Sequence, residues 1–210
     1  MTDSVAGDYL RVALALDDGR LRHSMILAEA LRGAFLIDFA RVGILEERTT
    51  GSELDTSPTG SDSADDLLAE VEDHPQRTMQ CWLQRGVPHV HEVIAELIAD
   101  GVWHAERHGF ADLHVRYVDV DGARYDKLAK TLESVVQGHV AAIDARQAAL
   151  AALAAVTGLT SANPLAPVPE HLLQTCRTLE PIVRDVTDFL IAADAQARAV
   201  SLLTRPSSRY

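Results

Sequence analysis

The sequence predicts a mainly α-helical fold: a single helical domain with one projecting β-hairpin. Three observations support this fold class. Apolar residues recur at helical spacing in most segments of the 210-residue chain. Residues 102–118 instead alternate between apolar and polar side chains, and Gly109 offers a turn within them. Hydrophobic residues make up 47% of the chain and aromatic residues only 5%, which is typical of a helical core of Ala, Leu and Val.

The first half of the chain is expected to hold several helices and one long loop. Apolar periodicity predicts helices at residues 8–17, 24–42, 65–73, 75–85 and 88–100. The first ends at an Asp-Asp-Gly turn, and the second begins at Ser24 as its N-cap and stops at Gly43. Residues 44–48 are expected to form a short strand. The acidic segment 49–64, rich in Ser, Thr and Gly, is expected to be a mobile loop, and residues 49–62 of it are expected to be dispensable.

The hairpin and further helices follow in the second half. Residues 102–106 and 110–118 are predicted to be strands joined by an Arg-His-Gly turn. Helices are expected at residues 125–137, 140–157 and 170–203. Pro181 is expected to divide the last of these. All the elements are expected to form one domain, residues 8–204.

The net charge of −12 is concentrated in one segment. Residues 49–76 hold eight acidic and no basic side chains, so the remainder is nearly neutral and lacks a general nucleic-acid-binding pattern. No apolar run reaches the ~20 residues that span a bilayer. The N-terminal residues carry acids and no basic region, unlike a secretory signal. Two cysteines make no disulfide framework. We therefore expect a cytoplasmic protein, which could be peripheral on the inner face of a membrane.

Motifs for catalysis, cofactors and metals are not found. The chain has no G-x-S-x-G, no P-loop and no Rossmann glycine pattern. His89 and His91 are two residues apart, and side chains with this spacing on a helix do not face each other. Neither a cysteine nor an H-E-x-x-H pattern accompanies them. We expect a protein that is not an enzyme, with no cofactor and no metal site.

One cation interrupts the apolar face of the helix at 24–42. Arg32 stands within this face beside Gly33, a residue that permits close approach of another segment. A buried cation needs a partner, which is either an internal carboxylate or a bound anion. Helix N-termini favour anions, because their free N–H groups and the positive end of the helix dipole lie there. Further candidates for an anion or lipid-headgroup site stand near the start of this helix: Arg20, Arg22 and His23.

Four segments, in this order, resemble the Golgi phosphoprotein 3 family, and more closely its short bacterial members. They are LRGAFLIDFARVGIL at 31–45, LLAEVEDHPQRTMQCWLQR at 67–85, VIAELIADGVWHAERHGF at 93–110 and IDARQAALAALAAVTGL at 143–159. Residues 31–45 look like the family's LRG helix, and residues 67–85 look like its LLDEAL segment with the following Trp-containing helix. Residues 93–110 look like its L-x-x-x-G-V-L helix and hairpin, and residues 143–159 look like its D-x-R helix. The resemblance covers about residues 8–199.

This resemblance implies an all-α fold with a hairpin and a peripheral membrane adaptor. Eukaryotic members bind phosphatidylinositol 4-phosphate and the cytoplasmic tails of glycosyltransferases. Their headgroup pocket uses a Trp and an Arg of the LRG helix region and two further arginines. Arg32 matches the LRG arginine, whereas His23, Val87 and Val90 stand at the other three positions. We therefore expect binding to anionic phospholipid headgroups without selectivity for one phosphatidylinositol phosphate.

The hairpin is the second candidate contact surface. Trp103, Phe110 and Leu113 supply apolar area there, and an unpaired hairpin edge is a natural site for another chain. We expect the hairpin to contact a membrane or a second copy, which would make the protein a homo-oligomer. The alternative is ordinary packing of the strands onto the preceding helix.

The alternative function is a winged-helix-like DNA-binding regulator built on residues 76–118, where a helix, a glycine and a hairpin follow one another. Winged helices that bind DNA present a basic recognition helix. Residues 88–100 contain no Lys or Arg, only histidines and acidic side chains among their charged groups. We therefore expect no nucleic-acid partner.

Overall fold

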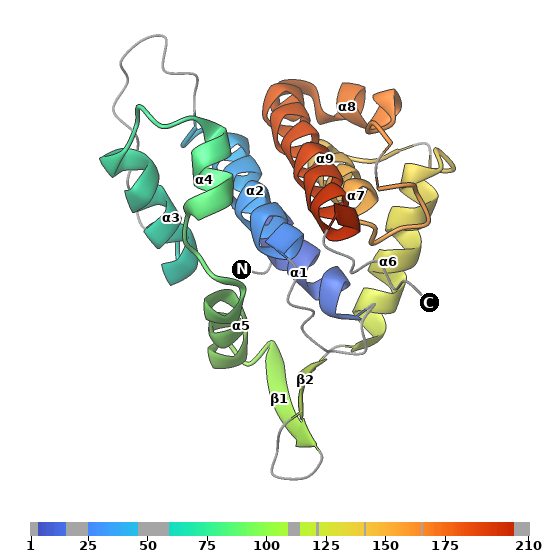
Figure 1. Ribbon diagram of the computed structural model, residues 1–210. Helices are drawn as coiled ribbons and strands as arrows, with labels where there is room; N and C mark the ends of the chain where they lie inside the picture. Colours follow the sequence, from blue (N-terminus) through green and yellow to red (C-terminus); the bar gives the residue numbers. More distant parts are fainter. Residues whose placement is uncertain are drawn as a thin grey trace, which may run out of the picture.

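The computed structural model confirms the predicted fold class, with helices and a two-stranded antiparallel hairpin (Figure 1). It describes residues 4–15, 25–45, 59–108, 114–120, 122–140, 142–164 and 166–203. The elements are α1 (Val5–Ala15), α2 (Met25–Arg41), α3 (Asp62–Asp73), α4 (Met79–Arg85), α5 (Val90–Ala99), β1 (Trp103–His108), β2 (His114–Asp119), α6 (Gly122–Val136), α7 (Ala145–Val156), α8 (Glu170–Cys176), a 3-10 turn (Arg177–Leu179) and α9 (Glu180–Leu203). The bounds of α2, α5 and α6 agree closely with the predicted ones.

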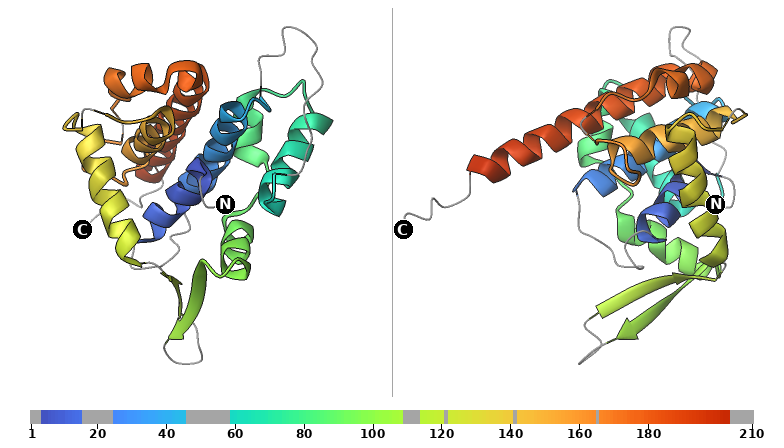
Figure 2. Two further views of the ribbon diagram at one scale, coloured as in Figure 1. Left: turned by 180° about the vertical axis from the view of Figure 1, so that it is seen from behind. Right: turned by 90° about the vertical axis from the view of Figure 1, so that its right-hand side faces the viewer.

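The core is built around α2 and α7. Every residue of α7 from Ala148 to Val156 is buried, because its Ala/Leu sequence is apolar on all sides. Helix α2 packs against α1, α4, α7 and α9. In Figures 1 and 2, α3, α4 and α5 lie on one side of α2, and α6 to α9 lie on the other. A central helix of this kind is expected to be apolar around most of its circumference.

Helices α2 and α9 approach closely at Gly33. A Cβ atom at this position would lie 2.4 Å from Val186 Cγ1 and 3.5 Å from Leu83 Cδ2. Val186 is fully buried, and its β-branched side chain has little rotamer freedom in a helix. The close approach that the sequence predicts beside Arg32 is therefore confirmed, and α9 is the segment that makes it.

A carboxylate on α2 caps α1. Asp38 accepts the N–H of Val5 on Oδ1 and the N–H of Ala6 on Oδ2, both at 3.0 Å. Burial raises the pKa of Asp38, and these two N–H groups oppose that rise. The helix expected from residue 8 begins instead at Val5, because a side chain distant in the sequence satisfies its first N–H groups.

Helix α3 begins earlier than expected, because a local serine caps it and a distant carboxylate supports that cap. Ser61 is its N-cap, and the Ser61 hydroxyl donates to Glu96 Oε2 of α5 at 2.7 Å. Glu96 also accepts the N–H of Ser63. Residues 61–64 of the expected loop therefore form the cap and first turn of α3. Residues 49–58 lie outside the described part of the chain.

The hairpin projects from the helical body, as the side view in Figure 2 shows. Arg107 and His108, which were expected in the turn, belong to β1 and pair with β2, and residues 109–113 lie outside the described part. At the base, the Trp103 side chain is only 3% exposed, and its Nε1 donates to Asp119 Oδ2 at 2.9 Å. The hairpin is thus anchored in the core by its first residue.

Two helices begin later than predicted. Residues 75–76 form a turn, and α4 begins after Thr78, its N-cap. Helix α7 begins after Asp144, not at residue 140, because Asp144 and Gln147 form a reciprocal capping box.

The end of α2 and the start of α9 are also settled by local geometry. The N–H groups of Ile44 and Leu45 both bond to Phe39 O, so a helix cap replaces the start of the strand expected at 44–48. The predicted break near Pro181 is confirmed. Pro181 lies in the first turn of α9, where a missing N–H is tolerated, and the 3-10 turn precedes it.

Candidate functional site

Arg32 lies in the middle of α2, facing α4. The residue is 5% exposed, and its Nε donates to the carbonyl oxygen of Leu83 at 2.7 Å. This bond ties α2 to α4 and fixes the plane of the guanidinium. Within the described part of the chain, neither terminal nitrogen of Arg32 has a hydrogen-bond or ion-pair partner.

Two carboxylates balance the charge of Arg32 at longer range. Burial lowers the pKa of Arg32, while Glu29 and Glu70 oppose this effect through their negative charge. Glu29, one turn earlier on α2, is 5% exposed, and burial raises its pKa against the attraction of Arg32. The sequence left open an internal carboxylate or an external anion, and the structure supplies acidic neighbours without a direct ion pair.

Glu70 of α3 joins the site to the segment between α4 and α5. Its Oε1 accepts from Arg77 Nη1 at 2.9 Å, and its Oε2 accepts the N–H of Val87 at 3.2 Å. A Cβ atom on Gly86 would lie 3.2 Å from Glu70 Oε2, 3.4 Å from Arg32 Cδ and 2.6 Å from the carbonyl oxygen of Trp82. Glycine at position 86 therefore allows these groups to converge.

The structure brings some of the predicted site residues together. The backbone of Val87 lies beside Arg32 through the shared neighbours Gly86 and Glu70, and Val90 follows at the start of α5. Arg20, Arg22 and His23 lie outside the described residues, as do Phe110 and Leu113. The buried Trp103 side chain contributes to the core and leaves little area for a partner.

Sequence reasoning did not find Glu29, Glu70 or Arg77. The spacing of Glu29 and Arg32, three residues apart on one helix, could have signalled the first of these. Glu70 and Arg77 reach the site only because α3 and the following turn fold back against α2 and α4, and no local pattern reports that.

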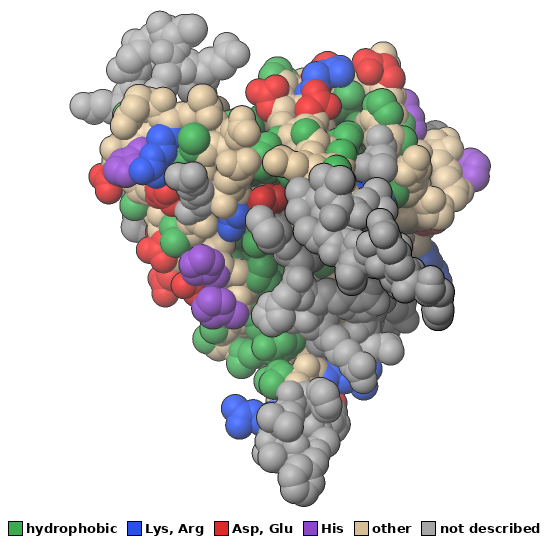
Figure 3. Space-filling model, in the orientation of Figure 1, with side chains coloured by type: hydrophobic (Ala, Val, Ile, Leu, Met, Phe, Trp, Pro, Cys, Tyr) green, Lys and Arg blue, Asp and Glu red, His purple; other side chains and the backbone are tan. Residues whose placement is uncertain are grey.

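Acidic side chains and histidines gather over α3 and α5 on the face shown in Figure 3. The rings of His89 and His91 stack with centroids 5.7 Å apart. They can meet, contrary to expectation, because His89 is the extended N-cap of α5 and not a helical residue. Across the described residues, no three His, Cys, Asp or Glu side chains assemble into a set that could hold a metal ion.

A comparison with protein families decides the relationship of the chain. The family model for Golgi phosphoprotein 3 (GPP34) matches residues 8–202. The chain belongs to the Golgi phosphoprotein 3 family. The match includes all the segments that carry the resemblance in the sequence. A comparison with curated proteins found no significant match. No helix among the described residues of this family member is long and apolar enough to cross a membrane.

In this Golgi phosphoprotein 3 family member, Glu29→Gln should become more stable relative to wild type as pH rises from about 4 to about 7. The folded-state pKa of Glu29 is raised by burial. An acid with a raised pKa loses stabilisation as pH increases from its unfolded-state pKa, about 4.3, through its folded-state pKa. Glutamine cannot ionise and so removes this loss.

Urea denaturation of both proteins across this pH range measures the difference. Asp66→Asn, which neutralises an exposed acid on α3, is the control. A difference between Glu29→Gln and wild type that stays constant or shrinks would mean that attraction to Arg32 outweighs burial.

Proposed function

We propose that this protein is a non-enzymatic adaptor that attaches peripherally to an anionic membrane surface and holds a phospholipid headgroup at Arg32. The observation that carries the proposal is the state of the guanidinium. Its Nε is held by Leu83 O, while its terminal nitrogens have no partner within the described residues. A guanidinium fixed in this way suits an anionic oxygen, because its plane is already oriented.

Weak selectivity among headgroups follows from the residues around Arg32. Val87 and Val90 stand where eukaryotic members have arginines, and these valines offer an anion only backbone N–H groups. The Val87 N–H is itself bonded to Glu70. Arg32 and a nearby backbone donor can recognise phosphate as a charge but cannot surround an inositol ring. We propose that tails of membrane proteins are the cargo of the adaptor.

The hairpin provides a second attachment, either to the membrane or to another copy. Val115 and Val120, in and after β2, are 37% and 66% exposed. Among the residues that the structure describes, no further strand pairs with the outer edges of this two-stranded ribbon. Unpaired edges and exposed apolar residues favour association. A DNA-binding role is disfavoured, because α5 carries one histidine, two glutamates and no Lys or Arg.

Vesicle co-sedimentation tests the headgroup proposal. Wild type should bind anionic vesicles at low salt and not neutral ones, and binding should fall as salt screens the charges. Arg32→Ala should bind roughly five-fold more weakly, since one cation near such a surface contributes about 1 kcal/mol. Arg32→Lys should recover only part of the loss, because an ammonium lacks the planar fork.

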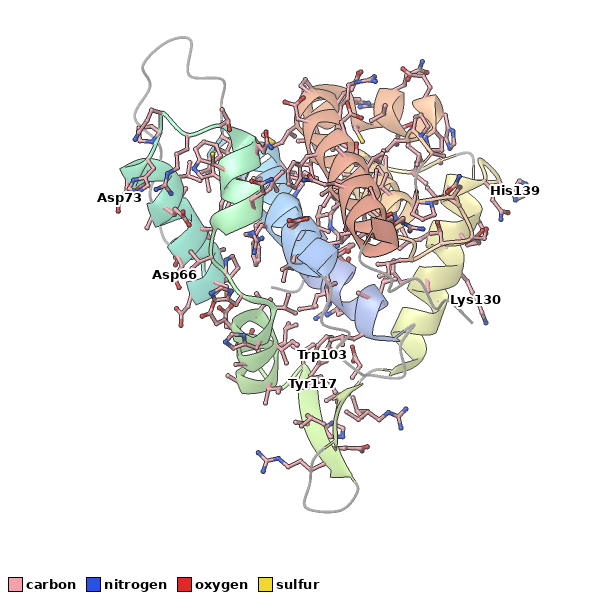
Figure 4. All side chains as sticks on the ribbon, in the orientation of Figure 1. Asp66, Asp73, Trp103, Tyr117, Lys130 and His139 are labelled. Atoms are coloured by element: carbon pink, nitrogen blue, oxygen red, sulfur yellow. The ribbon has the colours of Figure 1, made fainter. Side chains whose placement is uncertain are left out.

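Lys130→Ala is the control. Lys130 is an exposed cation on α6, away from α2 and α4 in Figure 4. If Arg32→Ala and Lys130→Ala lose vesicle binding equally, the effect comes only from the change in net charge. If Arg32→Ala binds vesicles as well as wild type does, Arg32 has only a structural role. Strong preference for one phosphoinositide would contradict the low selectivity.

Val115→Asp should shift the protein towards monomer in analytical ultracentrifugation, because it places a charge in the proposed hairpin contact. Val42→Asp provides the matched control, since Val42 is 59% exposed just after α2. A wild type that sediments as a monomer at high concentration would eliminate hairpin self-association.

A further inference from the structure

The hydrogen-bond donors near Arg32 already bind an anionic group of the protein itself, the Glu70 carboxylate. Glu70 takes one N–H from Arg77 and one from the Val87 backbone, through different carboxylate oxygens. Its Oε2 and the Cδ of Arg32 both lie close to the point where a Gly86 Cβ would stand, at 3.2 and 3.4 Å. The negative charge of Glu70 also acts on Arg32. A phosphate oxygen arriving at Arg32 would meet this carboxylate first.

The charges of the side chains around Arg32 also disfavour an added anion. Arg32 and Arg77 contribute two positive charges, and Glu29 and Glu70 contribute two negative ones, so this set of four side chains is neutral. An anionic ligand gains attraction only when one of the carboxylates is neutralised or moves away. Glu29 is buried beside Arg32 on the same helix. The Glu70 side chain is flexible and retains 20% exposure, so it can turn outward. Arg77, whose side chain is 40% exposed, can then donate to another anion.

We infer that Glu70 is an autoinhibitory counter-ion of the Arg32 site, and that a phosphate-type anion binds by displacing it and taking over the Val87 N–H and Arg77 Nη1. This inference rests on the proposed function, since it concerns control of the same site. It assigns two donors that the sequence did not indicate. Arg77, from the turn before α4, serves as the second cation of the site in place of the arginines absent at positions 87 and 90.

The test is the affinity of Glu70→Gln for inorganic phosphate, measured by calorimetry, and for anionic vesicles. Glutamine removes the charge and still offers a carbonyl oxygen to the Val87 N–H, so the link between α3 and the α4–α5 segment is preserved. We expect about ten-fold tighter phosphate binding than in wild type, the scale of a charge removed at close range. Arg32→Ala in the Glu70→Gln background should abolish this gain.

The matched control is Asp66→Asn, which changes the net charge equally. Asp66 and Asp73 lie on α3 and point away from α2 in Figure 4. An equal gain in Asp66→Asn, or no gain in Glu70→Gln, overturns the inference. If Glu70→Gln lacks a cooperative melting transition, the wild type is used instead. Displacement then predicts that phosphate shifts the backbone amide resonance of Val87, and an unmoved resonance overturns it.

The two proposals can fail separately. If wild type binds vesicles through Arg32 but Glu70→Gln gains nothing, the adaptor proposal stands and the autoinhibitory role is overturned. If Glu70→Gln gains phosphate affinity through Arg32 but neither protein binds vesicles, Glu70 does occupy the site and the ligand is free phosphate, not a lipid. Gains in both arms support a lipid headgroup as the ligand.

Discussion

Gly33→Ala should destabilise the protein even though alanine is the better helix former. Alanine would favour α2 by about 1 kcal/mol through intrinsic propensity. Its Cβ, however, would stand 2.4 Å from Val186 Cγ1, so α2 and α9 must move apart. Overpacking of this kind costs about 1–3 kcal/mol, and we expect a net loss. Urea denaturation followed by circular dichroism measures it.

Val186→Ala provides the control for this prediction through a double-mutant cycle. The single change Val186→Ala should destabilise by leaving a cavity. In its background, Gly33→Ala should cost much less or become favourable, because the clashing methyl group is gone, and the coupling should exceed about 0.5 kcal/mol. Additive losses would show that Gly33 is required for another reason.

Asp38→Ala is expected to have the largest effect on stability, a loss of about 2–4 kcal/mol from two unsatisfied buried donors. The N–H groups of Val5 and Ala6 each bond to one oxygen of this carboxylate at 3.0 Å, and both residues are fully buried, so water cannot replace it. Such a loss should lower the melting temperature of a protein of this size by roughly 4–16 °C. Differential scanning calorimetry measures the shift.

Asp38→Asn separates capping from charge. Its amide keeps one acceptor oxygen, so about half of the loss should return, although the ion pair of Asp38 with Arg41 disappears. Asp185→Ala, at an exposed position on α9, should change stability little. An Asp38→Ala protein as stable as wild type would mean that α1 does not depend on this cap.

Local sequence patterns predicted most helices because the signals for a helix lie within a few residues. The apolar spacing of residues 24–42 was sufficient for α2, and Pro181 for the break before α9. Where a cap is local, as with Asp144 and Gln147 at α7, the sequence itself holds the signal for the start of the helix. At α1 the cap comes from Asp38, 33 residues from Val5. At α3 the N-cap Ser61 is local, but Glu96 accepts from its hydroxyl and also from the N–H of Ser63, 33 residues away.

In the candidate site, too, the sequence predicts one part and the tertiary structure decides the rest. That Arg32 stands on an apolar face beside a close-approach glycine is a property of the sequence, since helical periodicity alone places both residues. The identity of its neighbours is not. Leu83 O is 51 residues away, and Glu70 arrives with α3. Burial turns these contacts into electrostatic constraints, because charges removed from water interact far more strongly than exposed ones.

What the sequence determined by itself was therefore the helical fold class, the family relationship and the one cation in the apolar face of α2. Tertiary structure alone decided that α9 packs on Gly33, that Trp103 is buried at the base of the hairpin, and that Glu70 shares the site of Arg32. Periodicity and capping act over one or two turns of chain, whereas packing and charge compensation depend on which distant surfaces meet.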